Sequence, residues 1–188
     1  MWEEYRKRKL EGFLKAKNRG ELDSDIVKLL DTINLLENYV TLSSCSGRIV
    51  VIDIPEVGDK RRAKFLGKWH DEVDFEVVLS TASKSENWGW LIQYPPIIHV
   101  ACRTLDDAER LMIAANDAGF RRSGIISVKN HVVEVASLER IELPVARSGR
   151  ILVSENYLRS VVEFANIKLK KGKERLERLY NLIKAFSE

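Results

Sequence analysis

Apolar side chains recur with a helical period at both ends of the chain. In residues 2–19 the apolar positions fall near one face of a helix, and the basic residues lie elsewhere. A second helix follows Asp23-Ser24, where either side chain can serve as N-cap. The final helix is expected from Ser154 onward, and Gly172 is the position where it could bend. The pattern therefore predicts that the chain begins and ends in helices.

The middle of the chain alternates between extended and helical patterns. Thr104 with Asp107 three residues later resembles a capping box, with Asp in place of Glu, and Gly119 suits the C-cap. A shorter helix is expected over residues 73–79. Strands are expected over residues 39–42, 49–54, 65–70, 88–92, 97–101, 123–128, 132–136 and 141–145. Together these elements predict an α+β fold with a single mixed β-sheet and packed helices.

A short motif recurs three times along the sequence. It reads Ser46-Gly47-Arg48-Ile49, then Arg122-Ser123-Gly124-Ile125, then Ser148-Gly149-Arg150-Ile151. The first two copies each follow a helix and a short extended stretch. This echo indicates an internal pseudo-duplication, in which two Ser-Gly turns occupy comparable places in the sheet.

The length and composition fit a single compact domain over residues 1–188. Charged residues interrupt the first 20 positions, and no apolar run approaches the roughly 20 residues of a membrane span. We therefore expect a soluble, cytoplasmic protein with no membrane partner. In that reducing compartment, Cys45 and Cys102 are expected to be thiols.

The net charge of +3 hides an uneven distribution of charge. Residues 1–20 carry a net charge of +4 and residues 159–184 carry +5, so the rest of the chain is acidic. Basic ends suit a phosphate-rich partner such as a nucleic acid. They are also typical of the solvated faces of amphipathic helices, so this pattern alone leaves both interpretations open.

Two classes of site are missing from the sequence. No two glycines occur as Gly-x-Gly, which argues against the dinucleotide fingerprint and the usual glycine-rich loop of Rossmann methyltransferases. His70, His99 and His131 are far apart and lack metal-ligand spacing, so no metal site is assigned.

The polar segment 43–48 is expected to be a loop between two strands. Its small residues can present backbone N–H groups to an anion, and Arg48 supplies a bidentate fork for carboxylate or phosphate. The same composition is typical of an ordinary turn. Cys45 could instead be a nucleophile activated by His99, although a lone thiol is more often a small buried residue.

Histidine and tryptophan side chains also have both a functional and a structural interpretation. His99 is expected in a strand, with its side chain on the same side as that of Ala101. It could be a proton-transfer group or a hydrogen-bonded core residue. Trp69, Trp88 and Trp90 could stack on a purine base or pack in the core.

Four blocks occur in the order of one known family. They are residues 39–49, which include the polar segment, then Lys68-Trp69-His70, then residues 96–103 around His99, then residues 118–125 around the second Ser-Gly motif. With these blocks the chain resembles the tRNA wybutosine-synthesizing protein 3 family, in a form that looks archaeal. The similarity covers nearly the whole chain. One departure is Tyr94, where the family pattern leads us to expect an acidic residue before the proline.

The resemblance implies a methyltransferase that depends on S-adenosylmethionine. The implied reaction is methylation of N4 in a wybutosine precursor at position 37, in the anticodon region of phenylalanine tRNA, tRNA(Phe). The implied fold is a mixed α+β sheet with internal duplication, unlike the Rossmann methyltransferases. Methyl transfer to nitrogen needs mainly alignment of donor and acceptor, and it needs a base only where a proton must leave.

The implied activity suggests which residues form the site. We expect His99 and Arg48 to act in catalysis, with His99 as the base. The methyl donor is expected to bind through Ser43, Ser44, Ser46, Gly47 and Arg48, with Arg122, Ser123 and Gly124 from the second Ser-Gly turn. The tRNA is expected to contact Trp69, which would stack on the modified guanine, and also His70, Arg103, Lys170, Lys171 and Lys173. The basic helices over residues 1–20 and 154–186 and the stretch 60–64 would bind tRNA phosphates.

Two alternatives belong to other functional classes. A non-catalytic RNA-binding module would explain the basic ends and the aromatic residues, but it would show no saturable affinity for S-adenosylmethionine. A cysteine-dependent hydrolase would lose its activity when Cys45 is replaced by serine.

Overall fold

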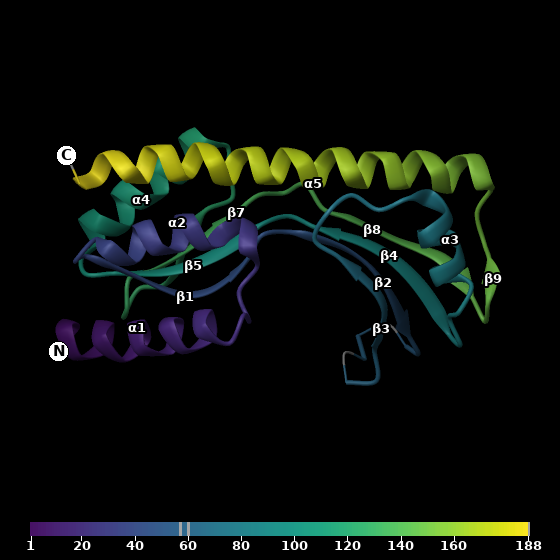
Figure 1. Ribbon diagram of the computed structural model, residues 1–188, viewed down its shortest axis with the longest axis horizontal. Helices are drawn as coiled ribbons and strands as arrows, with labels where there is room; N and C mark the ends of the chain where they lie inside the picture. Colours follow the sequence, from purple (N-terminus) through teal and green to yellow (C-terminus); the bar gives the residue numbers. More distant parts are fainter. Residues whose placement is uncertain (57, 60, 188) are drawn as a thin grey trace. The chain divides into compact units, whose positions relative to one another are not determined.

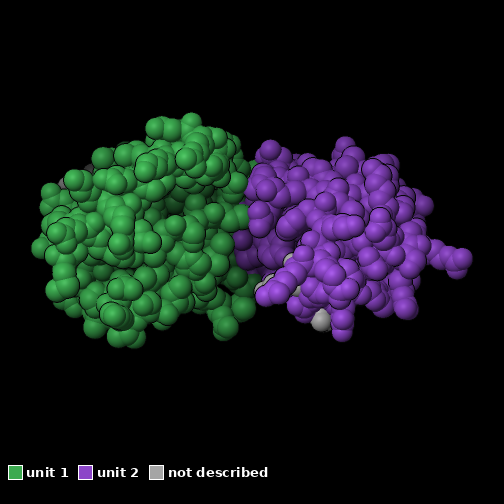
Figure 2. All heavy atoms as spheres, turned by 90° about the horizontal axis from the view of Figure 1, so that it is seen from below, with its two compact units in different colours: residues 1–46, 96–138, 172–188 green, residues 47–95, 139–171 purple. Residues whose placement is uncertain are grey.

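The structure is a computed structural model, and it describes residues 1–56, 58–59 and 61–187. The chain forms two compact units, which Figure 2 colours separately. Unit 1 consists of residues 1–46, 96–138 and 172–188, and unit 2 consists of residues 47–95 and 139–171. The single domain expected over residues 1–188 stays a prediction. In the part of the chain that the structure describes, no helix combines the length and the apolar character that a membrane span needs.

Unit 1 is built on a four-stranded antiparallel sheet with the order β1-β5-β7-β6. Its strands are β1 (Tyr39–Cys45), β5 (Ile97–Cys102), β7 (Val132–Ala136) and β6 (Gly124–Ser127). Its helices are α1 (Trp2–Asn18), α2 (Ser24–Leu35), α4 (Leu105–Ala118) and the C-terminal part of α5 (Glu155–Lys184), which leads into the short 3-10 helix η1 (Ala185–Ser187) (Figure 1).

The two faces of the unit 1 sheet pack against different helices because successive strand residues point to opposite sides. Ile98 and Val100 belong to the larger core, which also contains apolar residues of α2, α4 and α5. Val40 and Ala101 form a smaller cluster with side chains of α1. In α4, Thr104 and Asp107 form the expected capping box.

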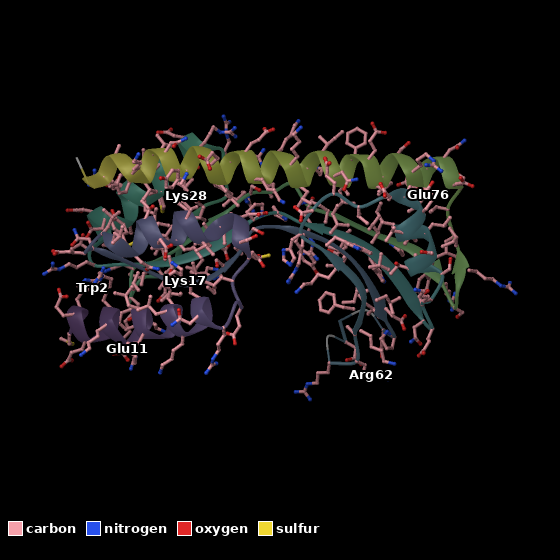
Figure 3. The ribbon with its side chains drawn as sticks, viewed as in Figure 1. Trp2, Glu11, Lys17, Lys28, Arg62 and Glu76 are labelled. Atoms are coloured by element: carbon pink, nitrogen blue, oxygen red, sulfur yellow. The ribbon has the colours of Figure 1, made fainter. Side chains whose placement is uncertain are left out.

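Polar contacts hold α1 in place, since this helix has no buried residue. The guanidinium of Arg6 donates to the carbonyls of Asn34, Leu36 and Tyr39 at 2.7 to 3.2 Å. Carbonyls at the end of a helix such as α2 need partners outside it. Lys17 of α1 adds an ion pair with Asp31 of α2 at 2.7 Å (Figure 3). Part of the positive charge in the N-terminal helix is therefore structural.

Unit 2 is built on a five-stranded antiparallel sheet with the order β3-β2-β4-β8-β9. The strands are β2 (Arg48–Ile54), β3 (Lys64–Trp69), β4 (Trp88–Tyr94), β8 (Ile141–Arg147) and β9 (Arg150–Ile151). Helix α3 (Phe75–Ala82) and the N-terminal part of α5 cover one face of this sheet (Figure 1). Ile49, Val51 and Leu91 of that face pack in a core with apolar residues of both helices. On the opposite face, the described residues of unit 2 form no helix (Figure 1).

Gly172 serves close packing within the uninterrupted helix α5. A bend was expected there, yet the helix continues through it (Figure 1). A Cβ atom at Gly172 would lie only 2.7 Å from Cδ of Pro96. The absence of a side chain therefore lets Pro96 approach the helix.

The predicted α+β class is confirmed, and the fold is not a Rossmann fold. The single mixed sheet is wrong, because the strands form two separate sheets whose pairs are antiparallel. An alternating pattern shows that a strand has two faces, but it does not identify the strand that pairs with it. The chain passes between the units four times, and two of these crossings, at Ser46-Gly47 and at Pro95-Pro96, resemble ordinary turns in the sequence. The internal duplication stays a prediction.

Candidate active site

Three polar side chains form a row across neighbouring strands of the unit 1 sheet. Ser43 of β1 lies opposite His99 of β5, and His99 lies opposite Glu134 of β7. The hydroxyl of Ser43 is 2.7 Å from Nδ1 of His99, and Nε2 of His99 is 2.9 Å from a carboxylate oxygen of Glu134. A bulge between Thr41 and Ser43 shifts the register of β1. Bulges of this kind re-aim side chains, and here the shift pairs Ser43 with His99.

The hydrogen bonds of this row favour one tautomer of a neutral His99 ring. An ionised Glu134 can only accept hydrogen bonds, so Nε2 of the ring carries the proton that is donated to it. In the neutral ring, Nδ1 then holds a lone pair and can accept a hydrogen bond from the Ser43 hydroxyl. The imidazole is thus oriented as a proton acceptor, with a carboxylate placed to stabilise the positive charge that protonation would create.

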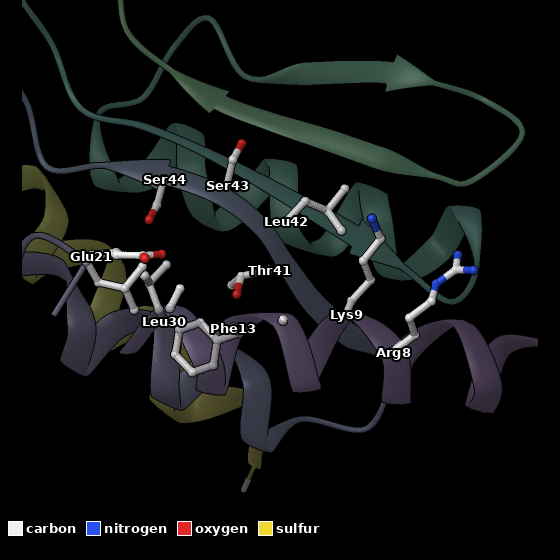
Figure 4. A pocket seen from close by; sticks show the side chains of 12 residues that line it. Arg8, Lys9, Phe13, Glu21, Leu30, Thr41, Leu42, Ser43 and Ser44 are labelled. Carbon is white, nitrogen blue, oxygen red and sulfur yellow. The ribbon is translucent and has the colours of Figure 1, made fainter. Parts of the chain in front are cut away.

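A pocket of about 580 Å³ lies beside Ser43, between α1 and β1. Figure 4 shows Lys9 reaching from α1 toward Leu42 of β1, while the hydroxyl of Ser44 points toward Glu21. The pocket is lined by Arg8, Lys9, Gly12, Phe13, Ala16, Glu21, Leu22, Leu30, Thr41, Leu42, Ser43 and Ser44. Its size is typical of small-molecule sites. Ser43 belongs to both the pocket and the hydrogen-bonded row.

The pocket combines charges of both signs with apolar surface. Arg8 and Lys9 lie near the ring of Tyr5, at 5.7 and 5.6 Å from its centroid. Glu21 supplies a carboxylate, and Phe13 with the neighbouring leucines supplies the apolar lining. This chemistry can hold a ligand that has a carboxylate, a positively charged group and an apolar or aromatic part.

The polar segment 43–48 is mostly strand, so its expected loop conformation is wrong. β1 continues through Cys45 and β2 begins at Arg48, which leaves only Ser46 and Gly47 between them. Ser46 is fully buried, and its N–H and hydroxyl donate to Asp23 at 2.8 and 3.2 Å. Gly47 has a φ of 92°, a conformation that favours glycine. These two residues therefore shape the connection rather than present free groups to a ligand.

Arg48 is in unit 2, on the face of the sheet that has no helix. Its guanidinium carbon lies 6.0 Å from the ring centroid of Phe65 and 5.7 Å from that of Tyr94. The row of Ser43, His99 and Glu134 belongs to unit 1. Its predicted roles in catalysis and donor binding stay predictions.

The second Ser-Gly turn begins strand β6 at the edge of the unit 1 sheet. The Ser123 hydroxyl donates to the carbonyl of Phe120 at 2.7 Å and accepts from the N–H of Ala136 at 3.3 Å, so it stabilises its own turn. Gly124 pairs with Glu134, at the far end of the row from Ser43. The side chain of Arg122 is exposed.

The residues expected to bind tRNA lie in several environments. Trp69 packs against the helix-covered core of unit 2, which favours its core interpretation, and the half-buried His70 follows it at the end of β3. Arg103 is exposed. On α5, Lys170 and Lys171 are exposed, whereas Lys173 pairs with Asp25 at 2.8 Å. Lys60, in the stretch 60–64, lies outside the described residues.

Sequence reasoning missed Glu134 and the two cations that line the pocket, Arg8 and Lys9. Glu134 is a lone acidic residue among the valines of β7, and that isolation was a usable signal. Cys45 does not fit the nucleophile alternative, because both ring nitrogens of His99 already bond to Ser43 and Glu134. Among the described residues, no group of three or more His, Cys, Asp or Glu side chains could hold a metal ion.

Comparison with known proteins identifies close relatives over nearly the whole chain. Residues 2–185 match the family described as Methyltransferase TYW3. The tRNA(Phe) 7-((3-amino-3-carboxypropyl)-4-demethylwyosine(37)-N(4))-methyltransferase of Archaeoglobus fulgidus is 58% identical, over 98% of this chain and 94% of that protein. A Pyrococcus furiosus enzyme of the same name, numbered 1, is 46% identical over 92% of this chain and 89% of its own length.

Solved structures show the same fold. The PH1069 protein from Pyrococcus horikoshii has a TM-score of 0.92 and 43% identity, covering 96% of this chain and 95% of that one. A hypothetical protein from Aeropyrum pernix has a TM-score of 0.73 and 26% identity, covering 87% of this chain and 98% of that one.

Proposed function

Because this chain belongs to the TYW3 methyltransferase family, we propose that it methylates N4 of 7-(3-amino-3-carboxypropyl)-4-demethylwyosine at position 37 of tRNA(Phe). The proposed methyl donor is S-adenosylmethionine. The resemblance seen in the sequence blocks is confirmed by the family match and by the relatives, which carry this activity in their names. The structural observation that supports the proposal is the row of Ser43, His99 and Glu134 beside the α1–β1 pocket.

The residues of the α1–β1 pocket fit S-adenosylmethionine. That molecule has a carboxylate, an ammonium, a sulfonium and an adenine ring. Arg8 and Lys9 would hold the carboxylate, and Glu21 would face a positively charged group. Phe13 offers an aromatic surface for the adenine. Ser43 and Ser44, expected to bind the donor, line this pocket.

The proposed reaction requires a proton acceptor as well as alignment. The donor, when bound, supplies an activated methyl group on its sulfonium. An unmethylated N4 carries a hydrogen, so forming the new N–C bond releases one proton. Ser43 can take that proton on its oxygen while passing its own hydroxyl proton to Nδ1 of His99. Glu134 positions the ring and stabilises the resulting imidazolium.

The cellular compartment and the target region of the tRNA are also part of the proposal. We infer that the protein acts in the cytoplasm of an archaeon, since the relatives are archaeal and the substrate named for them is tRNA. The anticodon region would be its target, because position 37 lies next to the anticodon. Lys170 and Lys171 remain candidates for phosphate contacts. The family match disfavours a purely binding module.

The proposal is tested by measuring methyl transfer and donor binding separately. Purified protein should transfer radiolabelled methyl groups from S-adenosylmethionine to precursor-bearing tRNA(Phe), and absence of transfer would refute the function. In calorimetry, Arg8→Met should weaken S-adenosylmethionine binding by roughly tenfold, because a charge-assisted contact is lost. Lys7→Met is the matched control, since Lys7 is an exposed neighbour that does not line the pocket. Equal affinities for the two variants would place the donor elsewhere.

A further inference from the structure

The helix-free face of the unit 2 sheet has its own hollow, which the reaction proposed above does not use. We call this surface the open face and define it by Arg48, Ile52, Phe65, Trp90, Tyr94 and Arg140. A hollow of about 400 Å³ lies over it, lined by Ile52, Phe65, Tyr94 and Arg140 among others. Buried Val50, Ile52 and Ile92 form its apolar floor. Its size is suited to one small planar ligand.

Aromatic rings and guanidinium groups alternate across four strands of the open face. Phe65 is on β3, Arg48 on β2 and Tyr94 on β4, and Arg140 directly precedes β8. The Arg48 guanidinium lies 6.0 Å from the ring centroid of Phe65 and 5.7 Å from that of Tyr94. Arg140 lies 4.7 Å from the Tyr94 ring. Such contacts pre-position both cations beside surfaces on which a planar ring can stack.

Two buried donors on this face have no hydrogen-bond partner among the described residues. They are Nε of Arg48 and Nε1 of Trp90. A buried donor without a partner is costly, and each such case calls for an explanation. Both atoms can only donate hydrogen bonds, and neither residue lines the hollow itself, so a ligand that reaches them from the hollow would have to present acceptors. A phosphate oxygen or the edge of a nucleic-acid base meets that requirement.

The two acidic residues beside the hollow, Glu142 and Asp59, each pair with an arginine. Glu142 pairs with Arg140 at 2.7 Å. Asp59 accepts hydrogen bonds from Arg62, which lies in the β2–β3 connection labelled in Figure 3. Phe65 is 57% exposed although it is a large apolar side chain. An exposed aromatic ring next to cations is typical of surfaces that bind single-stranded nucleic acid.

We propose that the open face binds one unpaired nucleotide of the RNA substrate, with its base stacked on Phe65 or Tyr94 and its phosphate held by Arg48 and Arg140. This inference rests on the proposed function, because it assumes that the substrate is a tRNA. Stacking platforms of this kind are sequence-tolerant, because every base has a π-face. Unpaired bases are available in a tRNA loop, whereas bases in a duplex are not. The open face would therefore hold a loop nucleotide through residues that do not line the α1–β1 pocket.

Two phenylalanines of unit 2 provide a matched test. Phe65→Ala removes the ring on the open face, and Phe164→Ala removes a ring of similar exposure, 59%, on the outer side of α5. We expect Phe65→Ala to weaken binding of tRNA(Phe) by roughly 5- to 100-fold, the effect of losing one stacked base. Phe164→Ala should leave the affinity unchanged. Both proteins should keep the wild-type circular dichroism spectrum and the wild-type affinity for S-adenosylmethionine.

The possible results separate this inference from the proposed function. If wild-type protein binds tRNA(Phe) and the two variants bind equally well, the open face is not an RNA site, while the proposed function stands. If wild-type protein does not bind tRNA, both fail.

A second pair of variants tests the phosphate contact. Arg140→Gln should reduce the salt dependence of tRNA binding by about one unit of slope, because one ion pair with a phosphate is lost. Exposed Arg150, on β9, is the control. If the salt dependence of tRNA binding has the same slope for Arg140→Gln and Arg150→Gln, Arg140 does not contact a phosphate.

Discussion

The unit 1 sheet and the open face of the unit 2 sheet both carry candidate functional side chains, but the two sets use their hydrogen-bonding capacity differently. In unit 1, Ser43, His99 and Glu134 satisfy one another at 2.7 and 2.9 Å. In unit 2, Arg48 and Trp90 keep buried donors that have no partner among the described residues. A satisfied row suits proton transfer, because its geometry is already fixed. A surface with unused donors suits binding, because a ligand can supply the acceptors.

The largest expected effect concerns the satisfied row. His99→Asn keeps a polar side chain but removes the proton acceptor, so methyl transfer should fall roughly 100- to 10,000-fold. Affinities for S-adenosylmethionine and tRNA should stay near wild type. Single-turnover transfer of radiolabelled methyl groups measures the first quantity, and calorimetry measures the others.

The third histidine of the chain supplies the control for this experiment. His131 lies in unit 1 with a φ of 46°, a conformation that asparagine tolerates. His131→Asn should therefore retain nearly full activity. If both variants lose activity equally, or neither does, the row of Ser43, His99 and Glu134 is not the proton acceptor.

The next effect concerns stability and compares satisfied and unsatisfied groups within unit 2. The buried carboxylate of Asp53 accepts hydrogen bonds from the backbone N–H groups of Glu86 and Asn87 and from the Asn87 amide. Asp53→Ala should lower the free energy of unfolding by about 3 kcal/mol, because buried donors lose a charged partner. Denaturant titration measures this change.

Trp90→Phe is the counterpart on the open face. It removes a donor that has no partner among the described residues, so the free energy of unfolding should change by less than about 1 kcal/mol. The same substitution should weaken tRNA binding if Nε1 donates to the ligand. A stability loss as large as that of Asp53→Ala would mean that Nε1 of Trp90 has a structural role. The proposed difference between the Asp53 carboxylate and this donor would then be wrong.

The helices were predictable from sequence because their signals are local. The apolar period marked both terminal helices, and Thr104, Asp107 and Gly119 marked the ends of α4, where Gly119 adopts a φ of 103°. The division into two sheets was not predictable, since strand pairing depends on partners far away in sequence. Gly172 shows the same limit, because the need for glycine there comes from close packing against Pro96, which is far away in sequence.

The candidate site was predictable only in part, for the same reason. Ser43 and His99 were singled out as residue types with chemistry, but Glu134 enters the site through the register of β5 and β7. Lys173 was assigned to RNA from its charge, yet it pairs with Asp25 of α2. Sequence shows that a cation is present, whereas only the fold shows which carboxylate lies beside it.

The smallest expected effect concerns the two thiols of unit 1. It tests whether Cys102 is protected in the core and whether Cys45 takes part in the reaction. Burial, with a smaller contribution from Asp107, raises the pKa of the Cys102 thiol to about 12. Since the thiolate is the reactive form, Cys102 should resist iodoacetamide at pH 8 in the folded protein and react only after denaturation. Half-exposed Cys45, at the end of β1, should be labelled first, as peptide mass spectrometry can measure.

Cys45→Ser should change the rate of methyl transfer by no more than about twofold, the usual range for a substitution outside the chemistry. A large loss of activity would restore Cys45 as a nucleophile and would contradict the assignment of His99 to Ser43 and Glu134.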